Sequence, residues 1–168
     1  RFEVAAYSYG RDDGSAYRRA AAAGAERFVD VAALSVEDTA HRIAEDAVDI
    51  LVDLGGYTKE HRLAALARRP APLQVHYLGY PATLGARFID YYVTDAVTSP
   101  PGQDGQFTEA MVRLPGCFMV SDPDQPLART RPLRTAFGLP EDAVVLCAFH
   151  QTAKIHPAVM TAWLAILA

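Results

Sequence analysis

Hydrophobic residues along the chain form short runs that alternate with segments of helical periodicity. Between residues 36 and 47, apolar side chains recur every three or four positions, as on one face of an amphipathic helix. Residues 49–54 instead form a continuous, branched run, which is typical of a strand covered on both faces. The pattern predicts strands at Phe2–Tyr9, Arg27–Val31, Asp49–Leu54, Leu73–Tyr77, Tyr91–Thr94, Met111–Leu114 and Ala143–Phe149.

Helices are predicted between the strands because start and stop signals stand at suitable places. Ser15 can cap a helix that Gly24 closes, and residues 35–38 resemble a capping box. The predicted helices are Ala16–Ala23, Ser35 to about Asp46, Glu60–Arg69, which Pro70 ends, and a segment that begins near Pro157.

Strands and helices that alternate at this pitch imply right-handed crossovers and a parallel sheet. The predicted fold class is therefore α/β with Rossmann-like parallel sheets. Residues 121–134 are rich in proline, arginine and aspartate and lack apolar periodicity, which is typical of a linker. We expect the C-terminal part, and most, of a first Rossmann-like lobe over residues 1–120, a linker over 121–136, and the first βα unit of a second lobe over 137–168.

Composition narrows the class of function. Hydrophobic residues make up 51% of the chain and charged residues 21%, which is a globular balance. A net charge of −4 and a pI near 5.7 argue against a basic nucleic-acid-binding surface. No apolar run is long enough to span a bilayer, and the glycine fingerprints of a nicotinamide site and of a P-loop are missing. Cys117 and Cys147 lack metal-ligand spacing, so we expect two small buried side chains in a reducing compartment.

Candidate chemistry lies in the loops that follow the strands, since ligands of parallel α/β sheets bind outside the carboxyl ends of the strands. Three loops fall there, residues 55–59, 78–83 and 150–154. A phosphate at the last loop would meet backbone N–H groups of a helix start, the amide of Gln151 and the ammonium of Lys154. Lys154 could stabilise a leaving diphosphate without a metal. The alternative is a solvated loop with a surface lysine.

The other two loops carry glycine and aromatic residues. Gly79 would let a ligand approach the backbone closely, and Tyr80 could stack on a sugar or hydrogen-bond to it. The alternative is a tight turn with a packed tyrosine. Thr58 and Lys59 follow a glycine pair that suits either a phosphate cradle or a plain turn.

The titratable residues leave more than one role open. No histidine pair has the spacing of a metal site. His76 alternates within a strand, which is typical of a satisfied core histidine. Asp53, at a strand end, is either structural or part of a cleft lining. His150 and His156 flank the Lys154 loop, where a ligand-facing role and a structural role are both open.

Four sequence blocks cover most of the chain and are characteristic when they occur in this order. Residues 49–59 end in GYTK. The others are residues 69–81, with RPAPLQ and LGYP, residues 90–100, with DYYVTD and SP, and residues 149–157, FHQTAKIHP. These blocks resemble the GYTK, RPAPIQ…LGYPGT, DYIITD…SP and FNQLYKIDP segments of the O-GlcNAc transferase family, which includes the Spindly-type protein O-fucosyltransferases.

The resemblance implies a GT-B fold, in which two Rossmann-like domains face each other across a cleft. It implies an inverting, metal-independent transferase without a cofactor, which moves N-acetylglucosamine from UDP-GlcNAc to serine or threonine hydroxyls of intracellular proteins. Gln151 and Lys154 match residues that contact the donor diphosphate, and Lys154 is the expected catalytic residue. Leu78, Gly79 and Pro81 match the loop near the donor sugar. The remaining expected cleft residues are Tyr80, Thr58, Lys59 and His150.

The sequence also departs from the animal members of the family. His150, Ala153 and Ala82 stand where those enzymes have asparagine, tyrosine and glycine, and the linker lacks their long insert, which favours a bacterial-type homologue. The chain starts at Arg1 and stops at Ala168 inside an apolar helical pattern, so we expect a fragment that is inactive alone. The family's catalytic histidine segment, its uridine pocket and its tetratricopeptide repeats would then lie outside the fragment.

The resemblance further implies a cytoplasmic enzyme whose partners are a nucleotide-sugar donor and a protein acceptor, with no nucleic acid or membrane. A Spindly-type protein O-fucosyltransferase that uses GDP-fucose would keep the fold and many of the motifs. A non-catalytic nucleotide- or protein-binding module of the same fold is a third reading. The sequence leaves the donor, the acceptor and the oligomeric state open.

Overall fold

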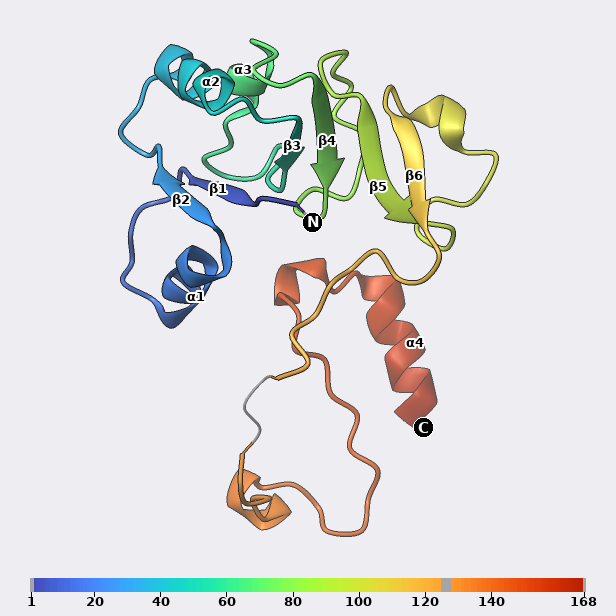
Figure 1. Cartoon of the computed structure of the whole chain (residues 1–168). Helices are drawn as coiled ribbons and strands as arrows, with labels where there is room; N and C mark the ends of the chain where they lie inside the picture. The colour runs from blue at the N-terminus through green and yellow to red at the C-terminus, as the bar shows by residue number, and fades with distance from the viewer. Residues whose placement is uncertain (1, 125–127, 168) are drawn as a thin grey trace. The chain divides into compact units, whose positions relative to one another are not determined.

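The computed structural model of the chain describes residues 2–124 and 128–167. The chain divides into two compact units, residues 1–121 and 122–168. All strands of the described residues belong to the first unit (Figure 1).

The strands of the first unit form two parallel sheets. The smaller sheet pairs β1 (Ala5–Ser8) with β2 (Arg27–Asp30). The larger sheet has four parallel strands that lie side by side in chain order (Figure 1). Its strands are β3 (Ile50–Asp53), β4 (Leu73–Tyr77), β5 (Tyr91–Asp95) and β6 (Ala110–Leu114). The parallel α/β arrangement predicted from the alternating pattern is confirmed.

Helices begin where the sequence predicts capping side chains. The hydroxyl oxygen of Ser15 accepts a hydrogen bond from the backbone N–H of Arg18 at 3.1 Å, and that of Ser35 accepts from Asp38 at 3.0 Å. Both caps were expected from the sequence. The helices are α1 (Ala16–Gly24), α2 (Val36–Glu45), α3 (Leu63–Leu66) and α4 (Pro157–Leu167), with short 3₁₀ helices at Asp104–Gln106, Arg134–Phe137 and Thr152–Lys154.

The first strand is shorter than the predicted Phe2–Tyr9, and two other predicted elements were wrong in extent or in kind. The helix expected over Glu60–Arg69 is only the single turn of α3: Arg62 is already non-helical, and left-handed φ angles of 63° at Glu60 and 55° at Arg69 exclude both ends of the expected range. Residues 143–149 form no strand in the second unit. A strand needs a neighbour to take its N–H and C=O groups, and the described part of that unit offers none.

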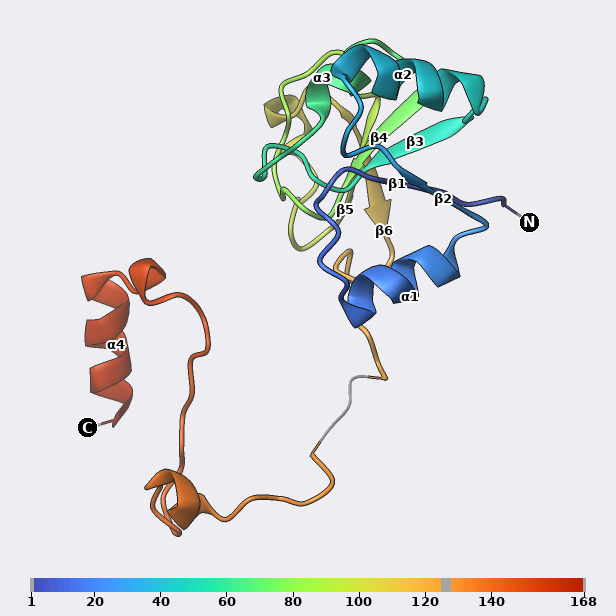
Figure 2. The same cartoon turned by 90° about the vertical axis from the view of Figure 1, so that its left-hand side faces the viewer.

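The core of the first unit lies under α2 and α3, which cover one face of the larger sheet at β3 and β4 (Figures 1 and 2). Ile43 of α2 and Leu63 of α3 pack there with Leu51 of β3. On the opposite face, Ile50 and Val52 are 49% and 45% exposed. The expectation that this strand is covered on both faces is therefore wrong for the described residues, which bury it on one face only.

A cavity of about 850 Å³ separates the two sheets. It is lined by residues 2–7 in and before β1 and by residues 49–54 in and around β3. Because β1 and β3 belong to different sheets, their facing edges leave backbone groups free of a ladder on that side. In the part of the chain that is described, no helix is long and apolar enough to cross a membrane.

The two cysteines were expected to be buried, and this was wrong. Cys117 and Cys147 are both exposed free thiols. Cys117 lies in the loop after β6, and Cys147 lies in the segment that forms no strand, so neither is held in a packed layer.

A hydrogen bond joins β1 to the end of α2. The hydroxyl of Tyr7 donates to Oδ2 of Asp46 at 2.7 Å, and Arg27 and Arg42 lie 3.0 and 3.1 Å from the same carboxylate. Burial, followed by this bond, raises the pKa of Tyr7 to about 12. The bond from Tyr7, ahead of the arginines, lowers the pKa of Asp46 below its usual range.

Replacing Tyr7 with phenylalanine is expected to lower the protection of β1 amides against hydrogen exchange by about 5-fold at pH 7, the effect of one hydrogen bond. Because the pKa of Asp46 is depressed, its contribution is present above about pH 4 and is lost as the pH falls through the depressed value. The difference in hydrogen-exchange protection between wild type and Tyr7→Phe should therefore become smaller at acid pH. Tyr17→Phe, at a residue that is 78% exposed, is the matched control and should change nothing.

Candidate functional site

The loops after β3 and β4 begin side by side because the two strands are paired in parallel. Asp53, the last residue of β3, is in register with His76 of β4. The loops at residues 54–59 and 78–83 therefore leave the same edge of the sheet, where a parallel α/β fold binds its ligands. The structure thus brings together the predicted site residues of the first unit.

Glycines allow the two loops to touch. A Cβ atom on Gly79 would overlap the carbonyl oxygen of Leu54, and one on Gly56 would overlap the Cβ of Tyr80. Leu78 adopts a left-handed φ of 75°, which is rare for a side chain of this kind. The bend formed by residues 78–81, here called the LGYP bend, is therefore a close, strained backbone contact rather than an open loop.

A carboxylate under the bend organises the glycine turn. Oδ1 of Asp53 accepts a hydrogen bond from the N–H of Gly55 at 3.2 Å, and Oδ2 accepts from Gly56 at 2.8 Å. Asp53 is buried. Burial alone would raise the pKa of Asp53, but the contact with His76 and these two N–H groups outweigh it, so the pKa lies below its usual value.

His76 connects that carboxylate to the LGYP bend. Its Nδ1 lies 3.3 Å from Oδ2 of Asp53, an ion-pair distance without the alignment of a hydrogen bond. Its Nε2 lies 2.5 Å from the carbonyl oxygen of Tyr80. The ring is fully buried and stacks on Tyr92 with centroids 5.3 Å apart. Sequence reasoning placed His76 in the core but missed this link; the signal available was an acid and a histidine near the carboxyl ends of consecutive strands.

Two of the polar residues in the loop after β3 donate hydrogen bonds to backbone carbonyl oxygens of the protein. Thr58 donates its hydroxyl to the carbonyl oxygen of Gly55 at 2.8 Å. Tyr57 donates to the carbonyl oxygen of Leu84 at 2.8 Å and meets Tyr80 edge-on, with ring centroids 5.6 Å apart. Lys59 is 91% exposed and lies 3.6 Å from Glu60. Tyr57 and Tyr80 are thus fixed beside the bend, whereas the ion pair that Lys59 makes within the described part of the chain is a weak surface contact.

The exposed parts of the bend are its backbone and proline. Gly79 and Pro81 are exposed, and Leu78 and Tyr80 are half-buried. A ligand at this edge would therefore meet main-chain groups and the faces of Tyr80 and Pro81. This is the kind of surface that binds a sugar ring by hydrogen bonds and stacking.

The second unit carries the predicted diphosphate-binding residues. Gln151 immediately precedes a 3₁₀ turn that ends at Lys154, and α4 starts three residues later at Pro157. Gln151 and Lys154 are exposed. His150 packs edge-on against Trp163 with ring centroids 5.8 Å apart, and Nδ1 of His156 accepts from the N–H of Ala158 at 3.3 Å. His156 thus has a structural role at the helix start, and His150 a packing contact.

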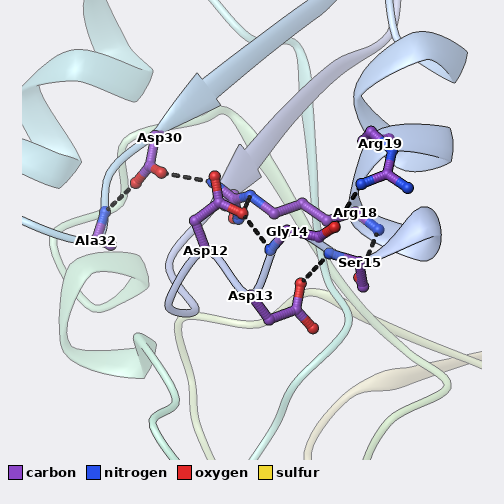
Figure 3. A network of polar contacts seen from close by, with 9 residues as sticks. Asp12, Asp13, Gly14, Ser15, Arg18, Arg19, Asp30 and Ala32 are labelled. Carbon is purple, nitrogen blue, oxygen red and sulfur yellow. Dashed lines mark hydrogen bonds and ion pairs between the residues drawn. The ribbon is translucent and has the colours of Figure 1, made fainter.

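A further polar network, which sequence reasoning missed, lies at the carboxyl ends of β1 and β2 (Figure 3). The guanidinium of Arg18 contacts Ser8 at 2.5 Å, Asp30 at 2.6 Å and Asp12 at 3.1 Å. The carboxylate of Asp12 also accepts from the N–H of Gly14 at 2.9 Å. These groups satisfy one another, so the network braces the loop after β1 rather than presenting free charge.

The fold resembles that of a solved glycosyltransferase. A lysine-to-methionine mutant of the Thermobaculum terrenum O-GlcNAc transferase superposes with a TM-score of 0.67 and is 40% identical in sequence. The match covers 73% of this chain and 24% of that one. The fold class is α/β of the GT-B type, as the sequence predicted.

The sequence profile of Glycosyl transferase family 41 matches residues 1–132 and 124–168, and the chain belongs to this family. The probable UDP-N-acetylglucosamine–peptide N-acetylglucosaminyltransferase SEC of Arabidopsis thaliana is 38% identical over 98% of this chain, which spans 17% of that protein. The Caenorhabditis elegans UDP-N-acetylglucosamine–peptide N-acetylglucosaminyltransferase is 42% identical over 76% of this chain, or 11% of its own length. The probable transferase SPINDLY of Arabidopsis thaliana is 37% identical over 82% of the chain.

Proposed function

We propose that the protein carrying this chain transfers N-acetylglucosamine from UDP-GlcNAc to serine or threonine hydroxyls of proteins. The observation that carries the proposal is the LGYP bend, packed by Gly79 against the end of β3, in a chain whose relatives are named as UDP-GlcNAc–peptide transferases. Its backbone and Tyr80 offer the contacts that a sugar ring requires.

The proposed reaction is a single displacement at the anomeric carbon. The acceptor oxygen attacks C1 from the face opposite the diphosphate, so one C–O bond forms as the other breaks and the configuration inverts. The hydroxyl proton passes to a general base, and UDP leaves with the bonding electrons. Lys154 neutralises the charge that grows on the diphosphate, and the amide of Gln151 donates to a phosphate oxygen. A lysine in this role takes the place that a metal ion fills in other glycosyltransferases.

The proposal includes the setting of the enzyme. Its partners are the nucleotide-sugar donor and a protein acceptor, which tetratricopeptide repeats of the same protein would present. Because the acceptors are intracellular proteins, the enzyme works in the cytoplasm. No nucleic acid or membrane takes part.

Donor competition tests the proposal. The full-length protein is given labelled UDP-GlcNAc and GDP-fucose at equal concentration with one serine- and threonine-rich peptide library, with and without a metal chelator. We expect label from UDP-GlcNAc on hydroxyl groups, at the same rate in both buffers. Label from GDP-fucose alone would support a Spindly-type fucosyltransferase, no label would support a binding module, and loss of activity with chelator would refute metal independence.

A further inference from the structure

The imidazole of His76 lies between two oxygen atoms, one in a hydrogen bond and one at ion-pair distance. Nδ1 is 3.3 Å from a carboxylate oxygen of Asp53, and Nε2 is 2.5 Å from the carbonyl oxygen of Tyr80. A neutral imidazole has a single N–H and would turn a lone pair toward one of these oxygens. The ring is fully buried, so water cannot relieve that repulsion. Only the imidazolium form carries a proton on both nitrogens, so that Nε2 donates to Tyr80 while the positive ring faces the Asp53 carboxylate.

The groups around the ring favour this charged form. From β3, Asp53 supplies the compensating negative charge. From the residue before β6, the buried carboxylate of Glu109 also acts on the ring, while it accepts hydrogen bonds from Thr83 at 2.7 Å and from the N–H of Leu84 at 2.8 Å. From β5, Tyr92 stacks on the ring. Two carboxylates and no other cation thus face His76 among the described contacts.

The same contacts tie together both loops of the candidate site. Asp53 holds the glycine turn through the N–H groups of Gly55 and Gly56, and His76 holds the LGYP bend through the carbonyl oxygen of Tyr80. The His76–Asp53 contact is the ionic connection between them. A change in the charge of His76 would therefore be felt at both loops at once.

We propose that His76 is a positioning residue whose imidazolium form, paired with Asp53, fixes the LGYP bend and thereby sets the affinity for the donor sugar. His76 does not touch the reacting atoms. It acts through Tyr80, so its loss should raise KM for the donor and leave the chemical step, which Lys154 serves, nearly unchanged. The inference rests on the proposed function for its kinetic consequence, but the protonation state is a property of the fold alone.

The expected pH window follows from the direction of the shifts. Burial lowers the pKa of His76, but the contacts with Asp53 and Tyr80 outweigh it and leave the pKa above its usual value. The positioning is therefore complete below about pH 6.5 and is lost as the pH rises through the raised value. At the acid end, it is lost as the pH falls through the depressed pKa of Asp53.

The kinetic experiment compares the full-length wild type with His76→Gln across the alkaline half of this window. The glutamine amide can still donate toward Tyr80 but cannot carry or lose a charge. Wild type should show KM for UDP-GlcNAc rising about 10-fold as His76 loses its proton, with kcat following a separate profile. His76→Gln should have a raised KM that does not change with pH over this range. A wild-type KM slope that persists in the variant would overturn the inference. His41→Gln, on the exposed surface of α2, is the control that should keep the wild-type profile.

The titration of His76 itself is measured by NMR of the imidazole nitrogens, which does not require activity. We expect both ring nitrogens to be protonated at pH 6.5 in wild type, and Asp53→Asn to move the midpoint to lower pH, together with the rise in KM. A neutral ring at pH 6.5, or an Asp53→Asn variant that moves neither midpoint, would overturn the inference even if His76→Gln did not fold. Wild-type protein that shows the protonated ring but no transfer from UDP-GlcNAc would instead contradict the proposed function.

Discussion

Alanine at position 154 is expected to lower kcat of the full-length enzyme by about 10²–10³-fold, with a much smaller change in KM for the donor. The loss of one preorganised charge that acts on a leaving group has effects of this size. Lys154 is exposed at the end of a 3₁₀ turn that leads into α4, so its removal leaves no buried group unpaired. The change should therefore affect the chemical step rather than folding.

Single-turnover rates with UDP-GlcNAc measure this effect. Lys154→Arg keeps the charge in a broader, planar group and should recover only part of the rate. Arg129→Ala, which removes an exposed charge in the linker, is the matched control and should be as active as wild type. Turnover that survives Lys154→Ala unchanged would remove this residue from the mechanism and leave the second unit without a demonstrated catalytic group.

Alanine at position 79 is expected to raise KM for the donor by at least about 10-fold and to lower the free energy of unfolding by about 1–3 kcal/mol. The new Cβ would overlap the carbonyl oxygen of Leu54, and backbone cannot swing aside as a long side chain can. The end of β3 and the LGYP bend must therefore separate. Gly116→Ala, where the added Cβ meets nothing within 4 Å, is the control and should be neutral in both measurements.

The Gly79→Ala variant distinguishes two possibilities: that the LGYP bend packs tightly against the end of β3, or that it lies near β3 without close contact. Thermal unfolding and donor KM are measured on the same preparation. If both stay at their wild-type values, the bend must be loose enough to absorb a methyl group, and the geometry that supports the sugar site would be wrong.

The sequence predicted the first unit well because each strand carries its own local signal. Hydrophobic periodicity, capping serines and prolines determine where helices and strands start and stop. Each of these signals depends on residues that are close together in the sequence. The helix expected over Glu60–Arg69 is shorter than predicted because its two end residues are left-handed, and neither glutamate nor arginine is a residue type that favours this conformation. No strand forms over residues 143–149 because a strand needs a neighbouring strand to hydrogen-bond its backbone, and the described part of the second unit has none.

The sequence predicted where the loops of the candidate site lie, but it did not predict the side-chain contacts that join them. The glycine-rich loops could be located because ligands gather at the carboxyl ends of parallel strands. The link between Asp53 and His76 depends on strand register, which places these residues opposite each other and which no local pattern reveals. The placement of Gln151 and Lys154 against a ligand stays a prediction.

The two exposed thiols allow the distance between the two units of the chain to be measured. Cys117 lies in the first unit and Cys147 in the second, so a pair of spin labels would span them without any substitution in this chain. Once other cysteines of the full-length protein are changed to serine, pulsed EPR with and without UDP would record the distribution of separations directly. A distribution that narrows with the nucleotide would reveal domain closure in solution.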